Sequence, residues 1–264
     1  MKVAVAGGTG LTGRHLAHSL TAAGHEPVLL ARSRGVDLVT GEGLAGALAG
    51  VDAVVDVSNV TTTRREVSER FFTAATAHLR DAAADAGVGH HVVLSIVGLD
   101  RVDLPYYAGK RRQEQLLAAG TVPWTVLRTT QFHEFAAQLL ARTSGPVALV
   151  PAMPSRPVSV AEVAEALVEA VLAGPLDGYA TELAGPEVLR LDDMARQVLR
   201  RHGDRRGDRH GDRHGGRRWG RRWVLPVRLP GRVGRQLRSG GALPDGEFRE
   251  GKRTFADYLA TIEP

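Results

Sequence analysis

Cysteine is absent from this chain of 264 residues, and lysine is rare. Without thiols, the protein has no disulfide, no thiolate metal site and no cysteine nucleophile. Its ten histidines show none of the spacings typical of metal ligands, so we expect no metal site. The lysines are Lys2, Lys110 and Lys252, and the remaining basic side chains are arginine. This scarcity makes each lysine a candidate for a specific role.

Long apolar runs are also absent, because no segment approaches the roughly 18 residues that a membrane helix needs. A strand-like segment at residues 3–6 follows the first methionine too closely to leave room for a signal peptide. Aromatic residues make up only 5% of the chain, whereas hydrophobic residues make up 43%, so the core is built mainly from alanine, valine and leucine. We therefore expect a cytoplasmic protein, monomeric or homodimeric, that makes no contact with a membrane.

Positive charge is concentrated in one stretch. Residues 196–238 hold 15 arginines and three acids, a local net charge of +12. The net charge of the whole chain is only +5. Inside this stretch a Gly-Asp-Arg unit occurs three times without any apolar face, which predicts a flexible Arg-rich loop at about residues 202–222. Such a loop could also serve as a patch for nucleic acid or an anionic membrane, but we favour a low-complexity loop without a nucleic-acid partner.

The first two-thirds of the chain alternates short apolar runs with alanine-rich helical stretches. We expect strands at residues 3–6, 27–31, 53–57, 91–96 and 124–128, with a further one at 147–150, and helices at residues 13–23, 65–86 and 110–119. Strands that are apolar on both faces and alternate with helices indicate a parallel sheet covered on both sides. The expected fold class is therefore α/β, a Rossmann doubly wound parallel sheet.

The pattern changes after about residue 150. Helices are expected at residues 160–173, at 192 to about 202, and at 254–262. We therefore expect an NAD(P)-binding domain at residues 1–150 and a smaller C-terminal α/β substrate lobe at 151–264, interleaved with the first.

A glycine-rich turn joins the first expected strand to the first helix. Gly7, Gly10 and Gly13 are spaced by three, with Thr9, Leu11 and Thr12 between them. The order of strand, glycine turn and helix is typical of dinucleotide binding, because glycines permit a tight turn and let the backbone approach a pyrophosphate. Free N–H groups at the start of the helix then bind the diphosphate.

The residues after the second and third expected strands bear on the choice of cofactor. NAD enzymes usually place an acid after the second strand, but this chain has Arg32 and Arg34 there. Arginines bind a 2′-phosphate with paired hydrogen bonds, so NADP(H) is favoured over NAD(H). Ser58 and Asn59 follow the third strand and suit contacts with the cofactor, or an ordinary turn.

A Tyr-x-x-x-Lys pattern supplies the catalytic candidates. Tyr106 and Lys110 share one face if both lie on a helix, and a nearby ammonium moves the pKa of a tyrosine toward neutrality. Ser95 ends the fourth expected strand, where its hydroxyl could orient a substrate carbonyl. Because Pro105 can delay the start of the helix, Tyr107 is an alternative to Tyr106.

Polar residues also follow the strand at 124–128. Gln131, Phe132 and His133 are candidates for contacts with the substrate. The alternative is that this segment is an ordinary helix start, with Glu134 favouring the positive end of the helix dipole.

The chain resembles the atypical short-chain dehydrogenase/reductases, specifically their NmrA-like NAD(P)-binding group. The resemblance covers nearly the whole chain and rests on residues 5–13, 56–59, 94–98, 106–110, 124–132, 182–187 and 254–255. It implies a Rossmann domain with a small C-terminal lobe that binds NADP(H), in a group that contains reductases, isomerases and non-catalytic sensors. Our first hypothesis is an NADPH-dependent reductase of a carbonyl or a conjugated C=C bond in a small hydrophobic molecule. A non-catalytic NADP(H) sensor and, less favoured, a nucleotide-sugar epimerase or dehydratase are the alternatives. The Gly-Asp-Arg repeat departs from the group and resembles an insertion.

Overall fold

A computed structural model describes residues 1–203 and 222–262 of the chain. Nearly all of the Arg-rich loop predicted at about 202–222 lies outside these residues. The described chain divides into two compact units built from interleaved segments. The first contains Met1–Thr129, Val160–Leu183 and Pro244–Arg249; the second contains Thr130–Ser159, Ala184–Leu243 and Glu250–Pro264. Residues 130–150 thus group with the second unit, whereas the sequence suggested a boundary near residue 150.

A parallel sheet forms the centre of the first unit. Its strands are β1 (Lys2–Ala6), β2 (Glu26–Leu30), β3 (Ala53–Asp56), β4 (His90–Ile96) and β5 (Trp124–Thr129), in the order β2-β1-β3-β4-β5. The five strands expected from the sequence are therefore present. Chain order reverses at β1, which pairs with both β2 and β3 and creates the switch point of a doubly wound fold. The predicted Rossmann fold class is confirmed.

Three short strands extend this sheet beyond β5. Both β8 (Gly178–Tyr179) and β9 (Glu182–Ala184) pair with β5 in parallel, and β12 (Phe248–Glu250) lies next to β9. Strands of two or three residues carry too little periodic pattern to be found in a sequence.

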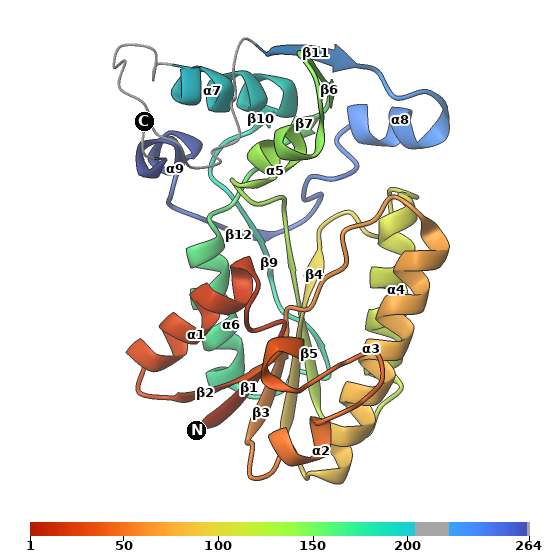
Figure 1. Cartoon of the computed structure of the whole chain (residues 1–264), viewed down its shortest axis with the longest axis vertical. Coiled ribbons are helices and arrows are strands. Elements are labelled where there is room, and N and C mark those ends of the chain that lie inside the picture. Colours follow the sequence, from red (N-terminus) through yellow and green to blue (C-terminus); the bar gives the residue numbers. More distant parts are fainter. Residues whose placement is uncertain (204–221, 263–264) are drawn as a thin grey trace. The chain divides into compact units, whose positions relative to one another are not determined.

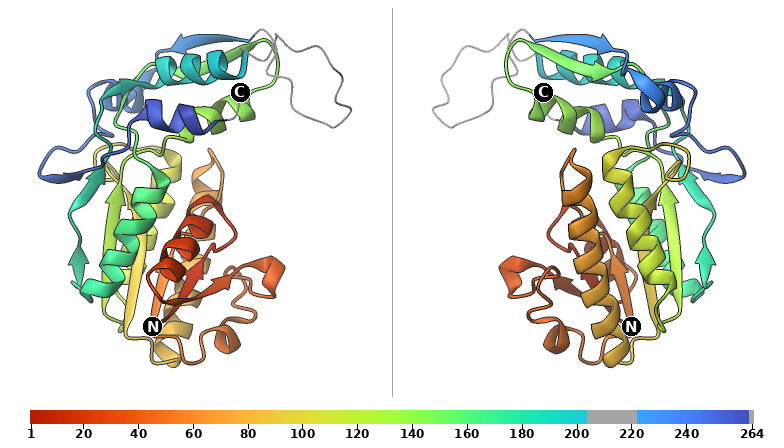
Figure 2. Two further views of the ribbon diagram at one scale, coloured as in Figure 1. Left: turned by 90° about the vertical axis from the view of Figure 1, so that its left-hand side faces the viewer. Right: turned by 90° about the vertical axis from the view of Figure 1, so that its right-hand side faces the viewer.

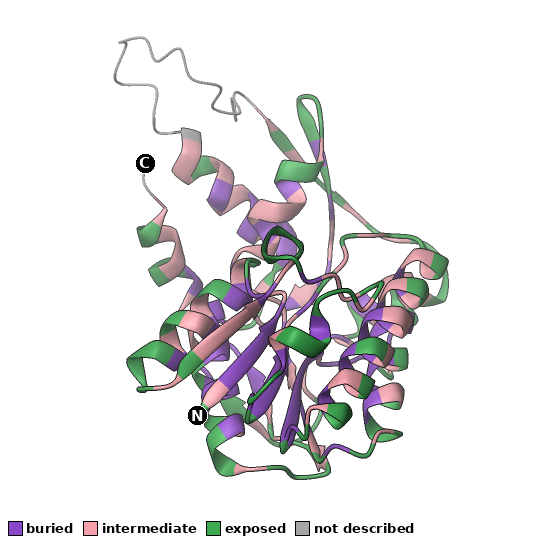
Figure 3. Cartoon of the chain, turned by 60° about the horizontal axis from the view of Figure 1, so that its bottom comes forward, coloured by how far each residue is buried: buried purple, intermediate pink, exposed green. Residues whose placement is uncertain are grey.

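Two helices cover each face of the central sheet. On one face lie α1 (Leu11–Ala22) and α6 (Val160–Ala173), and on the other lie α3 (Arg65–Asp85) and α4 (Pro105–Ala118), as both Figure 1 and Figure 2 show. In Figure 3 the central strands β1, β3 and β4 are largely purple, the colour of buried residues, whereas the outer faces of the helices carry the green of exposed residues. The strand residues Val3–Ala6 and Ala53–Asp56 are buried throughout, which explains the apolar runs at residues 3–6 and 53–55.

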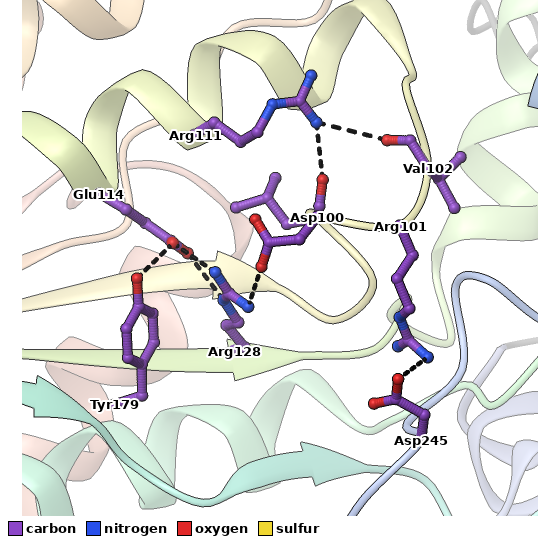
Figure 4. Close-up of polar contacts among 9 residues, drawn as sticks. Asp100, Arg101, Val102, Arg111, Glu114, Arg128, Tyr179 and Asp245 are labelled. Atoms are coloured by element: carbon purple, nitrogen blue, oxygen red, sulfur yellow. Dashed lines mark hydrogen bonds and ion pairs between the residues drawn. The ribbon is translucent and has the colours of Figure 1, made fainter.

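A buried ion pair ties α4 to β5 (Figure 4). Arg128 donates from Nε and Nη2 to the two carboxylate oxygens of Glu114, at 3.0 and 2.6 Å, and from Nη1 to Asp100 at 2.7 Å. Its guanidinium lies 4.6 Å from the centre of the Tyr179 ring, and the Tyr179 hydroxyl donates to Glu114 at 3.1 Å. Because each charge has a partner, this polar cluster can be held next to the apolar core. Figure 4 also shows the neighbouring pair of Arg101 and Asp245, whose charged atoms are 2.8 Å apart.

The second unit contains short helices and two small sheets. Its helices are α5 (Phe135–Arg142), α7 (Leu191–Gly203), α8 (Gly231–Arg238) and α9 (Phe255–Thr261). In the sheets, β6 (Val147–Pro151) pairs in parallel with β11 (Trp223–Val227), and β7 (Pro154–Ser155) pairs antiparallel with β10 (Leu189–Arg190). A capping box formed by Thr254 and Asp257 starts α9. Among residues 1–203 and 222–262, no helix has the length and apolar character to cross a membrane.

Candidate functional site

The glycine turn lies between β1 and α1, at the switch point. Gly7 has a φ of +78°, and a Cβ there would approach the Cα of Ser58 to 2.9 Å. A Cβ on Gly13 would lie 2.3 Å from the carbonyl oxygen of Gly7. The first glycine is therefore required by its backbone conformation and the last by the close approach of α1 to the turn.

The N-terminus of α1 is open to an anion. Its N-cap, Gly10, provides no side-chain cap, and its first turn contains no acid. The first backbone bond of the helix runs from the Arg14 N–H to the Gly10 carbonyl, so the N–H groups of Leu11 and Thr12 precede the helical ladder. The Arg14 side chain donates to the Thr9 carbonyl at 2.6 Å and braces the turn. Uncapped N–H groups and the helix dipole together suit a phosphate group.

Arg32 and Arg34 form a short 3-10 helix, η1 (Arg32–Arg34), directly after β2. Both side chains are exposed, and within the described part of the chain neither has an ion-pair or hydrogen-bond partner. The next carboxylate in the sequence, Asp37, accepts a hydrogen bond from the Val39 N–H at 2.7 Å and so closes its own turn. Both guanidinium groups are available to an anionic ligand.

The end of β3 brings a carboxylate and two polar side chains to the same edge of the sheet. Asp56 is fully buried, and its Oδ1 accepts a hydrogen bond from the Ser58 N–H at 2.8 Å. The Ser58 hydroxyl is buried without a hydrogen-bond partner among the described residues. Asn59 is exposed and accepts a hydrogen bond from the Tyr106 hydroxyl at 2.7 Å.

Helix α4 begins at Pro105, so it includes both members of the Tyr-x-x-x-Lys pattern. Burial raises the pKa of Tyr106 above its usual range, and the neighbouring Tyr107 and Asp56 raise it further. Lys110 points into the protein and donates from Nζ to the Leu94 carbonyl at 2.6 Å and to Gln113 Oε1 at 2.5 Å. The expected lowering of the Tyr106 pKa by this ammonium is therefore not what the structure shows, because burial dominates.

The pKa of Lys110 itself is lowered to about 8, mainly by burial, against the opposing charges of Asp56 and Glu114. A buried ammonium loses the solvation by water that stabilises its charge. Lys110 therefore depends on its protein neighbours to remain charged at neutral pH.

Two other candidates lie near α4. Ser95, on β4, is 2% exposed, and its hydroxyl has no hydrogen-bond partner among residues 1–203 and 222–262. Tyr107 is 6% exposed, and its ring packs edge-on against the ring of Tyr106, with centroids 6.3 Å apart. Tyr107 is thus the more deeply packed of the two tyrosines.

Gln131, Phe132 and His133 belong to the second unit. Gln131 accepts a hydrogen bond from the Ser155 hydroxyl at 3.0 Å, and Phe132 forms a parallel bridge with Val158. The ring of His133 is buried beside the rings of Phe255 and Tyr258, at 5.9 and 5.6 Å between centroids. These three residues are part of the packing of the second unit, and their role toward a substrate stays a prediction. Glu134 is the N-cap of α5, which agrees with the helix start that the sequence offered as the alternative for this segment.

Two buried polar residues at this site were missed, Asp56 and Gln113. Gln113 Nε2 donates to the second carboxylate oxygen of Asp56 at 2.8 Å, and Gln113 Oε1 accepts from Lys110. One signal was visible: an acid at the end of an otherwise apolar strand, Ala-Val-Val-Asp, is unusual. Its pairing with a residue 57 positions away was not visible.

Comparison with known sequences finds a match to a protein family and to a named relative. The sequence signature described as NAD(P)H-binding matches residues 7–173. A reductase of (4-alkanoyl-5-oxo-2,5-dihydrofuran-3-yl)methyl phosphate from Streptomyces griseus is 31% identical over 215 residues, which are 75% of this chain and 73% of the relative.

Comparison with solved structures agrees on the fold. MoeE5 in complex with UDP-glucuronic acid and NAD superposes with a TM-score of 0.68 at 18% identity, covering 99% of this chain and 97% of the other. The triphenylmethane reductase of Citrobacter sp. complexed with NADP(H) gives 0.59 at 20% identity, covering 76% and 75%. At such identities the likeness concerns the fold alone.

Proposed function

Because the chain belongs to the family of NAD(P)H-binding proteins, with the character of an oxidoreductase, we propose that it is a cytoplasmic NADPH-dependent reductase of the short-chain, NmrA-like type. Its substrate is a small hydrophobic molecule with a carbonyl or a conjugated C=C bond. The observation that carries the proposal is the open N-terminus of α1 behind the glycine turn, together with the two unpaired arginines after β2. A pyrophosphate fits the first feature and a 2′-phosphate fits the second.

The preference for NADP(H) over NAD(H) follows from charge. Arg32 and Arg34 have no carboxylate partner among the described residues, so binding a 2′-phosphate breaks no existing ion pair. A ribose 2′-hydroxyl offers neither arginine an opposite charge. The two guanidinium groups thus favour the phosphorylated cofactor.

Three side chains of the first unit would support the chemistry. The cofactor, when bound, supplies the hydride. The phenol of Tyr106 is protonated at neutral pH and would donate its proton to the substrate oxygen during reduction. An ammonium has three donors, and Lys110 uses two of them on Leu94 and Gln113, which leaves one for a ribose hydroxyl. The unpartnered hydroxyl of Ser95 would orient the substrate carbonyl.

The substrate class draws support from the relative in Streptomyces griseus. The compound for which that reductase is named is a 5-oxo-2,5-dihydrofuran that carries an alkanoyl group and a methyl phosphate group. A ring of that kind contains a C=C bond next to carbonyl groups. A conjugated C=C bond in a small acylated ring is therefore the first substrate to try.

The test is NADPH oxidation, followed by the loss of the reduced cofactor's absorbance, with a panel of acyl-dihydrofuranones, enones and quinones. We expect turnover with at least one class, and a preference for NADPH over NADH that falls by about tenfold or more in the Arg32→Ala/Arg34→Ala double variant. Tight NADPH binding without turnover on the whole panel would overturn the reductase and favour the sensor. Turnover of a nucleotide sugar would favour the epimerase or dehydratase.

A further inference from the structure

Lys110 is held by a short chain of buried hydrogen bonds. Its side chain is 4% exposed, and one of its two acceptors is the amide oxygen of Gln113, one turn further along α4. The amide nitrogen of Gln113 points the other way and donates to Oδ2 of Asp56. Gln113 thus joins a buried ammonium to a buried carboxylate, with donors and acceptors matched at each step.

The same carboxylate contacts the wall of the glycine turn. Asp56 Oδ1 accepts from the Ser58 N–H, and the Cα of Ser58 lies where a Cβ on Gly7 would collide with it. One carboxylate group therefore fixes two parts of the site: Lys110, through Gln113, and the backbone against which the cofactor turn packs.

No other acid near Lys110 in the described part of the chain can replace Asp56. Glu114, on the same helix, is already engaged by Arg128 and Tyr179. On the sheet side His91 interacts with Asp56, and burial lowers the pKa of its imidazole to about 4, so this ring is neutral at pH 7. From α3 the ring of Phe72 lies 4.9 Å from the ammonium and offers only a cation–π contact. Asp56 is therefore the main negative charge that compensates Lys110, ahead of Glu114.

We propose that Asp56 and Gln113 are positioning residues of this reductase, which orient Lys110 and, through Ser58, seat the glycine turn for the cofactor. The role of Lys110 in this statement depends on the function proposed above. The hydrogen-bond chain itself is independent of which substrate is reduced.

The direction of the hydrogen bonds makes the proposal testable by exchange. In Asp56→Asn, the NH₂ group of the new amide faces the NH₂ group of Gln113. Both groups are donors, so the hydrogen bond between the two side chains is lost. If Gln113 turns over to accept from it, its own N–H₂ then faces Lys110, and two donors meet. Adding Gln113→Glu restores a match, because the new carboxylate accepts both from the amide introduced at position 56 and from Lys110. The double variant keeps the net charge of the wild type.

The scarcity of lysine supplies a direct readout. With Lys2, Lys110 and Lys252 as the only lysines, NMR of protein labelled at the lysine side chains gives three resolvable titrations. In Asp56→Asn the titration of Lys110 should move to lower pH by about one unit or more, because a buried ammonium has lost its opposite charge. The Kd for NADPH should rise about tenfold and kcat should fall, because Lys110 is no longer firmly oriented, whereas the amide oxygen still accepts from the Ser58 N–H. In Asp56→Asn/Gln113→Glu, all three should return toward the wild type.

Gln115→Glu is the matched control, since it adds the same charge at an exposed position two residues along α4. It should leave the Lys110 titration, the Kd and kcat unchanged. If Asp56→Asn does not fold, the double variant carries the test, and its failure to restore a folded protein with a wild-type Lys110 titration overturns the proposal. An unchanged Lys110 titration in folded Asp56→Asn also overturns it. If the titration and the Kd respond and recover but no substrate is turned over, the positioning by Asp56 and Gln113 stands and the reductase fails.

Discussion

The Tyr106 hydroxyl donates a hydrogen bond to the side-chain oxygen of Asn59, at 2.7 Å, and so joins the start of α4 to the loop after β3. This contact aims the proposed proton donor at the edge of the sheet that the glycine turn occupies. Tyr107, by contrast, is packed inward. We therefore expect substitution of the two neighbouring tyrosines to have different effects on activity.

Tyr106→Phe should lower kcat for reduction by about 10²- to 10⁴-fold, because it removes the proton donor. The Kd for NADPH should change by less than about threefold, since the phenol is not proposed to bind the cofactor. Both follow from steady-state kinetics and cofactor fluorescence. Tyr107→Phe is the matched variant and should retain activity. The reverse pattern, with Tyr107→Phe inactive and Tyr106→Phe active, would assign the acid to Tyr107.

Gly13→Ala should weaken NADPH binding by about tenfold or more. The added Cβ would lie 2.3 Å from the Gly7 carbonyl oxygen and 2.6 Å from the Gly8 Cα, so the turn and α1 must move apart. Isothermal titration calorimetry with NADPH measures the effect. Gly46→Ala is the control, because a Cβ there meets nothing within 4 Å, and its affinity should equal that of the wild type. An unaffected Kd in Gly13→Ala would show that the turn does not bind the cofactor.

Glu114→Gln should lower the free energy of unfolding by about 3 kcal/mol, because it leaves the largely buried Arg128 without its main opposite charge. Urea unfolding monitored by circular dichroism measures the change. Glu169→Gln is the control: its ion pair with Arg249 is exposed on both sides, so the loss should be no more than about 0.5 kcal/mol. Equal losses in the two variants would contradict a specific role for the buried pair.

Local pattern determined which parts of the molecule the sequence could predict. The helix at 160–173 has the predicted bounds because its apolar residues recur at helical spacing and Gly174, with a φ of +84°, follows its last residue. The glycine turn was found because all its glycines are close together in sequence. For helix α5 the sequence offered only a possible start near Glu134 and no end, because the helix is just eight residues long. The link from Asp56 to Lys110 was missed because it depends on a glutamine that is brought to β3 only by the fold.

Acid should destabilise this protein through His91. Burial lowers the pKa of His91 to about 4 from the ordinary 6.5, so between these values the unfolded chain binds more protons than the folded one. The free energy of unfolding therefore falls as pH decreases from 6.5 to about 4, with a contribution from His91 on the order of 2–3 kcal/mol.

Urea unfolding at several pH values, compared between wild type and His91→Leu, isolates this contribution, since carboxylates titrate in both. The loss of stability over that pH range should be smaller in His91→Leu by the amount that His91 contributes. His18→Leu, at an exposed position, should follow the wild type. Parallel curves for His91→Leu and wild type would show that His91 is protonated equally in the folded and unfolded chains.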